Sequence, residues 1–310
     1  MEPTPRPAIS PILRPSLVRR GFSDGEIRRL RQNGTWASVR RGGYLPTDVI
    51  NPLDRRERHA VLIRATLPGL KVPAVVSHCS AAVLLGIPLW STHLGIVHVT
   101  RHPPARNGQS AKLMVHVSAI AAEETRVVDG ITVTNPTRTI TDLARVLPFE
   151  QAVVSADAAL YMRLTTKELL TQAAARIVGQ PGSRAVQRVV QFADGLSESV
   201  GESRSRVLMQ LADLPAPVLQ PKVHDDRGHL LGRCDYGWKD GRLLGEFDGE
   251  VKYGRLLLPG ETAGDKIFKE KLREDLLRDT GARVVRWVWS ELDRPDRLSA
   301  RIRHALNAVG

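Results

Sequence analysis

The sequence predicts an α+β protein of several domains: an N-terminal helix–helix–hairpin module, a mixed α/β and helical middle, and a small C-terminal α/β core. A chain of 310 residues is long enough for about two or three domains. Its apolar fraction of 42% is sufficient for buried cores. Segments with apolar residues every three or four positions alternate with segments that have them every second position, which indicates helices mixed with strands. We place the domains at residues 1–58, 59–194 and 195–310.

The composition favours a cytoplasmic protein without a membrane span. No run of 18 apolar residues occurs, and the first residues, MEPTPRPAIS, lack the apolar segment of a secretory signal. The two cysteines, Cys79 and Cys234, are far apart and stand in unlike contexts. They therefore argue against a structural zinc site and fit a reducing compartment.

The chain is strongly basic, with a net charge of +12. Residues 1–60 carry twelve Arg, no Lys and six acids, residues 61–194 have a net charge of +5, and residues 195–310 have +1. A basic surface attracts phosphate backbones by releasing counterions from the nucleic acid. Many basic proteins bind no nucleic acid, so charge alone leaves this partner open.

The first domain begins with two predicted helices. Leu13, Leu17 and Val18 suggest an apolar face on the first helix. The second follows Ser23 and Glu26, which have the spacing of a capping box.

The segment TWASVRRGGYLPT then predicts a two-stranded hairpin. The order helix, helix, hairpin is that of a winged-helix domain, whose second helix meets the major groove of DNA and whose wing meets the flanking phosphates. Five arginines stand at those places: Arg28, Arg29 and Arg31 on the helix, and Arg40 and Arg41 at the wing. The alternative is a docking module with solvated arginines.

The middle of the chain mixes strands and helices. IVHVT, KLMVHVS and ITVT alternate as strands do, and SHCSAAVLLGIP predicts a short helix. NPTRTITDLARVL predicts a helix with a threonine cap after Asn135 and Pro136. Three further helices are expected at 149–161, at 165–177 with a capping box from Thr165 and Glu168, and at 183–194.

Two of these stretches, SHCSAAVLLGIPLW and VTNPTRTITDLAR, follow the predicted winged helix. Together the three resemble the AbiEi-type antitoxins of type IV toxin–antitoxin systems over about residues 8–150. The resemblance implies sequence-specific DNA binding, often at the protein's own promoter, and a cognate toxin or the product of a neighbouring gene as a partner. We interpret His78 as an early helix residue and Asp142 as an ordinary helical acid.

The last domain reads helix, three strands, helix, strand. SVGESRSRVLMQLADLPAP is the first helix, and Asp226-Arg227-Gly228 marks a hairpin turn. RLLGEFDGEVKY is a strand with its turn, and AGDKIFKEKLREDLLRD is a charged helix. In the final strand, ARVVRWVWS, Trp287 and Trp289 share one face, where core packing is expected.

That order is also the core of the PD-(D/E)XK restriction-endonuclease-like fold. GESRSR, Gln220, CDYGW, LLGEFDGEVKY and EKLREDLLRDTGARVVRWVW resemble, in order, a family related to the very-short-patch-repair endonucleases. The resemblance covers about residues 195–295. It implies an endonuclease that uses Mg²⁺ or Mn²⁺ to cleave phosphodiester bonds.

The acidic residues of this domain fit that chemistry, because a divalent cation held by two or three carboxylates both activates water and offsets phosphate charge. Asp235 and Glu246 should approach each other across two antiparallel strands joined by the turn KDG. Glu246 and Asp248 share one strand face, and Glu202 on the first helix would be the outer acid. Lys252 would position the attacking water or offset phosphate charge.

The motif departs from the usual Glu-x-Lys pattern, because Glu246-Phe247-Asp248 places an acid where the lysine belongs. Lys252 stands a few residues later, where the related family commonly has histidine. A relocated lysine and a degenerate site look alike in one sequence. Two hypotheses therefore stand: a metal-dependent endonuclease, and an antitoxin-like regulator whose nuclease fold is inert.

Ordinary structural roles would also explain several of these residues. Glu202 could cap its helix with Ser199, Asp248 could serve a turn, and Lys252 could be solvated. Glu246 is the hardest to explain in this way, because an acid in an apolar strand needs a partner or a metal.

Overall fold

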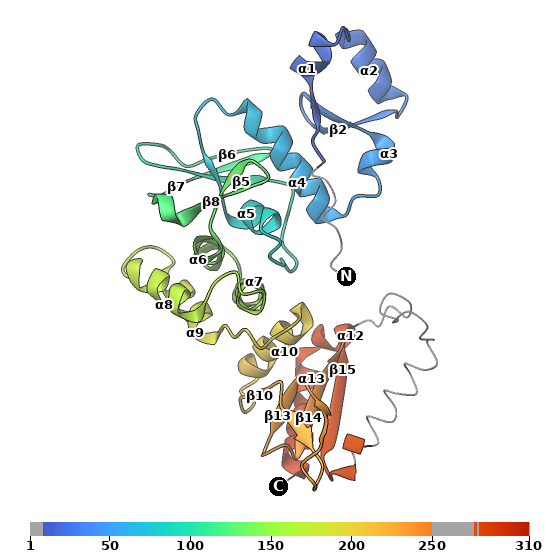
Figure 1. The fold of residues 1–310 in the computed structure, drawn as a ribbon, viewed down its shortest axis with the longest axis vertical. Helices are drawn as coiled ribbons and strands as arrows, with labels where there is room; N and C mark the ends of the chain where they lie inside the picture. The colour runs from blue at the N-terminus through green and yellow to red at the C-terminus, as the bar shows by residue number, and fades with distance from the viewer. Residues whose placement is uncertain (1–8, 250–275, 278, 310) are drawn as a thin grey trace. The chain divides into compact units, whose positions relative to one another are not determined.

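The computed structural model describes residues 9–249, 276–277 and 279–309. The chain forms two compact units (Figure 1). The first runs to Ser155 and includes Arg163–Gln191, and the second comprises Ala156–Met162 and the chain from Phe192 onward. Helices and several sheets alternate along the described residues, which confirms the α+β class. None of the described helices is long and apolar enough to cross a membrane.

The first unit opens with the two helices and the hairpin that the sequence predicts. The elements are β1 (Ile12–Leu13), α1 (Arg14–Arg19), α2 (Asp24–Gln32), β2 (Trp36–Arg40) and β3 (Gly43–Pro46). The three strands pair antiparallel in the order β1-β3-β2. A small cluster centred on Leu17, Ile27 and Tyr44 ties both helices to this sheet.

Local capping explains where α2 begins and ends. The predicted capping box is present: Glu26 N–H donates to Ser23 Oγ over 3.2 Å, and Ser23 N–H donates to Glu26 Oε2 over 2.7 Å. Gly34 then ends the helix in the left-handed region at a φ of +76°. The predicted apolar face of α1 is wrong in part, because Leu13 belongs to β1 and Val18 is 48% exposed.

The rest of the first unit is built around a six-stranded sheet in the order β6-β7-β5-β4-β9-β8. Its strands are β4 (Val75–Val76), β5 (Val97–Arg101), β6 (Gly108–Ser110), β7 (Leu113–Val117), β8 (Thr125–Val128) and β9 (Ile131–Thr134). The strands expected from IVHVT, KLMVHVS and ITVT are therefore confirmed. Short 3-10 turns at Leu67–Gly69 and Ala122–Glu124 complete the connections.

Helices line this sheet and extend the chain beyond it. They are α3 (Thr47–Ile50), α4 (Arg55–Thr66), α5 (His78–Leu84), α6 (Pro136–Val146), α7 (Phe149–Tyr161), α8 (Lys167–Arg176) and α9 (Ser183–Phe192). Two predicted caps are off by one or two residues. Asn135 rather than a threonine caps α6, and Thr166 rather than Thr165 caps α8.

The second unit holds a four-stranded sheet in the order β10-β13-β14-β15. Its described elements are α10 (Val200–Leu211), β10 (Val218–Leu219), β11 (Lys222–His224), β12 (Leu230–Arg233), β13 (Tyr236–Trp238), β14 (Leu243–Asp248), β15 (Arg283–Val288), α12 (Trp289–Leu292) and α13 (Pro295–Ala308). Strand β14 pairs antiparallel with β13 and parallel with β15.

Three details of this unit differ from the prediction. The hairpin around Arg227 forms a separate two-stranded ribbon, β11–β12, while β10 supplies the sheet edge. Trp289 begins α12 instead of sharing a strand face with Trp287. The final helix α13 has no counterpart in the sequence analysis.

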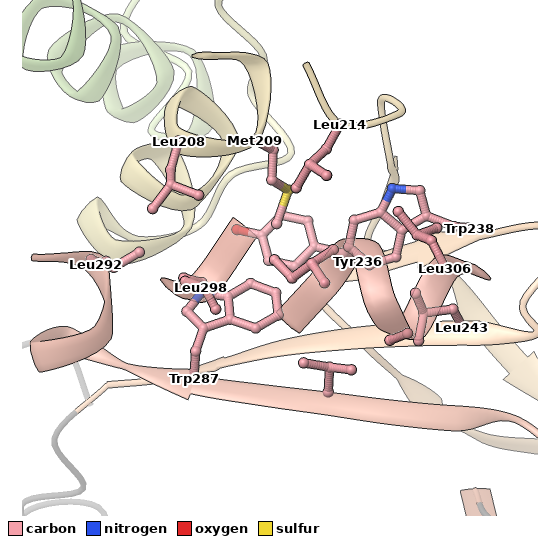
Figure 2. Packing of buried hydrophobic residues seen from close by; sticks show 13 residues of the cluster. Leu208, Met209, Leu214, Tyr236, Trp238, Leu243, Trp287, Leu292, Leu298 and Leu306 are labelled. Carbon is pink, nitrogen blue, oxygen red and sulfur yellow. The ribbon is translucent and has the colours of Figure 1, made fainter. Parts of the chain in front are cut away.

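The core of the second unit lies between the sheet and helices α10 and α13 (Figure 2). Side chains alternate along β14, so Leu243 enters this core and Leu244 enters a second cluster with Cys234 and Leu277. Trp287 crosses over Gly245, where an added Cβ would lie 2.8 Å from the indole. Both faces of β14 are thus buried, and an acid within it needs a specific reason.

Candidate functional site

Asp235 and Glu246 meet where β13 and β14 are paired. The antiparallel register sets Tyr236 opposite Gly245, and Asp235 and Glu246 are the residues that adjoin this pair in the chain. The turn at Lys239-Asp240-Gly241 fixes this register, with all three residues at positive φ. The Phe247 amide donates to Asp235 Oδ2 over 2.7 Å, which holds the aspartate beside the acidic end of β14.

Glu202 enters the same region from the first turn of α10. The helix is capped by Ser199, whose Oγ accepts from the Glu202 amide over 3.1 Å. The reciprocal bond of a capping box goes one residue further back, because Glu202 Oε2 accepts from the Glu198 amide over 2.9 Å. Glu202 therefore does cap its helix, and the residue is also buried, with its carboxylate in contact with Gln220.

Gln220 connects the two acids. Its Nε2 donates to Glu202 Oε2 over 3.0 Å, and its side chain lowers the pKa of Asp235. The backbone of Gln220 is left-handed at a φ of +50°, and its N–H donates to the Asp235 carbonyl over 3.0 Å. Residues with a backbone conformation of this kind are often found at functional sites.

The charges of the neighbouring acids affect Asp235. Burial, together with the negative charges of Glu202 and Glu246, raises the pKa of Asp235 to about 6, although the hydrogen bond from the Phe247 amide acts in the opposite direction. Burial also raises the pKa of Glu202, with the charge of Glu198 acting in the same direction. Carboxyls with raised pKa values close to like charges are candidates for chemistry or for cation binding.

Glu246 has a basic partner on the neighbouring strand. Arg286 stands beside it in the parallel register of β14 and β15, and its Nε donates to Glu246 Oε2 over 2.7 Å. Glu246 is 6% exposed, so this ion pair offsets much of the cost of burying its charge.

Asp248 and Lys252 are the other two predicted residues of this site. Asp248 ends β14 and is exposed, although it lies on the same strand face as Glu246. Lys252 lies outside the described residues. Structure therefore brings together Glu202, Asp235 and Glu246, with Asp248 at the margin.

The donor set suits a hard divalent cation, because Mg²⁺ and Mn²⁺ prefer carboxylate and amide oxygens. The carboxylates are nevertheless spread apart. Among the described residues, the only group of three or more histidine, cysteine or acidic side chains with ligand atoms all within 4.8 Å of one another is a histidine cluster elsewhere. Glu202, Asp235 and Glu246 do not form such a group, so a cation would have to draw them together.

The predicted DNA-contacting arginines lie at the start of the first unit. Arg28, Arg29 and Arg31 are exposed on α2, because Ile27 is the residue that this helix buries. Arg41 is exposed in the turn between β2 and β3, and Arg40 is half-buried at the end of β2. The five guanidinium groups thus come from one helix and the tip of one hairpin.

Sequence reasoning missed two features of the chemistry. Arg286 carried no local signal, because its partner is 40 residues away in the chain. The histidine cluster of His78, His98 and His116 was also missed, although two copies of the triplet Val-His-Val, at 97–99 and 115–117, place one histidine on each of two strands. Asp142 is likewise more than an ordinary helical acid: it is buried and pairs with Arg138 over 2.9 Å.

Comparison with known proteins places the chain in a family. No family model matches it. It is 31% identical over 206 residues to uncharacterized protein MT2308 and to uncharacterized protein Rv2248, from two strains of Mycobacterium tuberculosis, covering 66% of this chain and 72% of each relative. The chain belongs to the family of these two mycobacterial proteins. A crystal structure of the RV2827C protein from the same species aligns with 68% of this chain and 79% of its own at 18% identity, with a TM-score of 0.40, too low to indicate a shared fold.

Proposed function

We propose that this protein binds DNA through its N-terminal helices and hairpin and cleaves phosphodiester bonds with a Mg²⁺- or Mn²⁺-dependent site in its second unit. The observation that carries the proposal is the placement of three acids in one region, where Gln220 donates to Glu202 and the Phe247 amide donates to Asp235. Glu202 lies on α10, Asp235 directly precedes β13, and Glu246 lies on β14. Two buried acids, Glu202 and Glu246, beside the half-buried Asp235 are costly in a purely structural core.

Each residue of the proposed site has its own role. Asp235 and Glu246 would hold the cation, with Glu202 as the outer acid and Asp248 as a further oxygen donor at the strand end. When bound, the cation lowers the pKa of a water molecule and offsets charge on the scissile phosphate. Gln220 positions Glu202 through its side-chain amide and the backbone of Asp235 through its N–H. Lys252 keeps its proposed role of positioning the water or balancing phosphate charge, outside the described residues.

The order of elements supports a restriction-endonuclease-like unit. Helix α10 is followed by the antiparallel pair β13–β14, and β15 then adds parallel to β14. The site acids sit on the two central strands of this sheet and on the helix that packs against β14, as the resemblance to the very-short-patch-repair-related family implies.

The front of the chain supports a winged-helix module of the antitoxin-like kind. Its order of elements is helix, helix and hairpin within a three-stranded sheet. Exposed arginines on α2 would meet the major groove, and those of the hairpin would meet flanking phosphates.

Cleavage is tested with the full chain on supercoiled and linear DNA, with and without Mg²⁺ or Mn²⁺. We expect metal-dependent nicking or linearisation by wild type and its loss in Asp235→Asn and Glu246→Gln. Asp226→Asn, an exposed acid in the turn of the β11–β12 ribbon, is the matched control and should keep activity. The enzyme proposal is wrong if the wild-type protein shows no cleavage under any condition, or if the variants are as active as wild type.

The second candidate is a regulator with an inert nuclease fold, and the Arg286–Glu246 ion pair favours it. A guanidinium bound to a ligand carboxylate at 2.7 Å takes the place that a cation would need. This candidate requires salt-dependent binding to the DNA upstream of its own coding region and no Mn²⁺ binding. Calorimetry with Mn²⁺ separates the two, because saturable heat that disappears in Asp235→Asn supports the enzyme alone.

A further inference from the structure

Three histidines gather in the first unit, remote in sequence from the proposed nuclease site. His98 lies on β5 and His116 on β7, two parallel neighbours in the six-stranded sheet. Each stands between two valines, and the inward valines Val97, Val99 and Val115 are buried in the sheet's core cluster. Because side chains alternate along a strand, the two histidines share the opposite face. His78 joins them from the first position of α5.

The imidazole nitrogens are close enough for a shared ligand. His98 Nδ1 and His116 Nε2 are 3.0 Å apart, and one ligand atom from each of the three rings lies within 4.8 Å of the others. Two nitrogens on a tetrahedral Zn²⁺ are about 3.3 Å apart, given Zn–N bonds of about 2.0–2.1 Å. The pair on the strands is therefore already near the required spacing.

His78 is the ring that has to adjust. It stacks on His116 with centroids 3.7 Å apart and an interplanar angle of 16°, so its nitrogens run alongside those of His116. Tilting the ring about its side-chain bonds would aim one nitrogen between the other two. His78 Nδ1 is 2.9 Å from Ser77 Oγ, which itself accepts from Thr100 Oγ1 over 2.8 Å. This leaves Nε2 to face a metal and provides the oriented hydroxyl partner that metal-binding histidines commonly have.

The protonation state suits metal binding. Burial lowers the pKa of His78 well below its ordinary value, lowers that of His98 to about 4, and lowers that of His116 as well. The neutral imidazole is the form that binds metals. The histidine neighbours act in the same direction on His78 and His98, whereas burial alone lowers the pKa of His116.

The backbone at His78 adds a second sign of function. Its φ is +53°, in the left-handed region that residues other than glycine seldom adopt. A conformation of this kind costs on the order of 1–3 kcal/mol and persists where the surrounding structure holds it, often at binding sites. Here it turns the ring of the first helical residue toward β5 and β7.

We propose that His78, His98 and His116 form a binding site for one borderline transition-metal ion, Zn²⁺ above others, with the fourth position open to water or an anion. Imidazole ligands select Zn²⁺, Cu²⁺ or Ni²⁺ over Mg²⁺, so this site and the carboxylate site differ in the metal that they take. The proposal is independent of the proposed nuclease function.

The test uses the full chain stripped of metal with a chelator and titrated with Zn²⁺ by calorimetry and with Co²⁺ by visible absorption. We expect one equivalent of either ion, with the intense absorption of four-coordinate Co²⁺. His116→Ala should abolish that spectrum. Ser77→Ala should weaken Zn²⁺ binding about tenfold, as loss of a partner to a ligating histidine does.

Two controls keep the outcome specific. His102→Ala removes an exposed histidine of the same unit and should bind as wild type does. A double variant, Asp235→Asn with Glu246→Gln, should keep the Co²⁺ spectrum, which separates this site from the carboxylates. Circular dichroism checks that each variant folds, and the wild-type titration decides if one does not. Wild type without one-equivalent binding, or a His116→Ala spectrum equal to that of His102→Ala, overturns the proposal.

Discussion

Arg286 donates from Nε to Glu246 Oε2 over 2.7 Å, between residues that stand side by side on the parallel strands β14 and β15. This ion pair joins Glu246, which the sequence predicts as a metal ligand, to the positively charged side chain of Arg286. If Glu246 is a metal ligand, Arg286 and the metal compete for one carboxylate.

Replacing Arg286 with alanine should therefore strengthen Mn²⁺ binding. Removal of a competing charge equivalent to one pKa unit corresponds to about 1.4 kcal/mol, or about tenfold in affinity. Calorimetry on Arg286→Ala measures this, with Arg283→Ala as control because Arg283 is exposed on the same strand. Equal Mn²⁺ affinities in the two variants would remove Glu246 from the ligand set.

The raised pKa of Asp235 predicts how stability depends on pH in the absence of metal. The folded protein binds this proton more tightly than the unfolded chain, with a pKa of about 6 against an ordinary value of 3.8. The contribution of Asp235 to the free energy of unfolding is therefore neutral below pH 4, falls between pH 4 and 6, and remains unfavourable above. Asp235→Asn should raise stability at pH 7.5 by roughly 1–2 kcal/mol, allowing for partial exposure of the carboxyl.

Urea denaturation at several pH values in the presence of a chelator measures that difference. Asp142 and Asp157 also have raised pKa values, so the comparison is between variant and wild type at each pH. The contributions of Asp142 and Asp157 cancel in this comparison. A difference in stability that is the same at pH 4 and pH 7.5 would contradict the assigned titration.

Two glycines at equivalent helix positions should respond in opposite ways to alanine. Gly25 follows Ser23-Asp24 at the start of α2, and Gly201 follows Ser199-Val200 at the start of α10. A Cβ on Gly201 would overlap the ring of Phe247, whereas near Gly25 the closest atom is Ser23 Oγ at 3.9 Å. We expect Gly201→Ala to lose about 1–3 kcal/mol and Gly25→Ala to gain up to about 1 kcal/mol.

Tryptophan fluorescence during urea denaturation reports both glycine variants. The second unit contributes Trp238, Trp287 and Trp289, and the first contributes Trp36 and Trp90. Unchanged stability in Gly201→Ala would show that α10 does not pack on β14 through Gly201, and loss of stability in Gly25→Ala would contradict the open space beside Gly25.

The arginines of α2 should determine affinity for DNA. Each phosphate contact contributes about one unit to the slope of log affinity against log salt concentration. The double variant Arg28→Ala with Arg29→Ala should bind duplex DNA from upstream of its own coding region more weakly, with a slope reduced by about two. Fluorescence anisotropy across a salt series measures both quantities.

The control for this experiment is Arg126→Ala, which removes an exposed arginine from β8. It also lowers the positive charge of the first unit. It should leave the salt slope nearly unchanged. If all variants lose affinity in proportion to charge alone, binding is a property of the basic surface and not of α2.

The sequence predicted best what local chemistry determines. The start of α2 was readable because Ser23 and Glu26 cap one another within four residues. The approach of Asp235 to Glu246 followed from a three-residue turn that fixes an antiparallel register. Where two polar residues competed for a cap, as at Thr165 and Thr166, spacing chose the wrong one.

Contacts between segments that are distant in the chain could not be predicted from local sequence patterns. The parallel pairing of β5 with β7 brings His98 and His116 to 3.0 Å, and neither strand alone indicates its neighbour. The same is true of Arg286 and Glu246. Trp289 continued an alternating run in sequence, yet the chain turns into α12 at that residue, because Glu291 accepts from the Val288 amide and caps a helix there.

Glu202 and Asp235 lie in one network but under different selective pressures. Glu202 accepts the Glu198 amide at the start of α10, so it serves folding whether or not the protein cuts DNA. Asp235 burdens the folded state at neutral pH, and only a use for its charge would keep it there. If the proposed cleavage is correct, relatives that lack it should carry asparagine or another neutral residue in place of Asp235 while they keep Glu202.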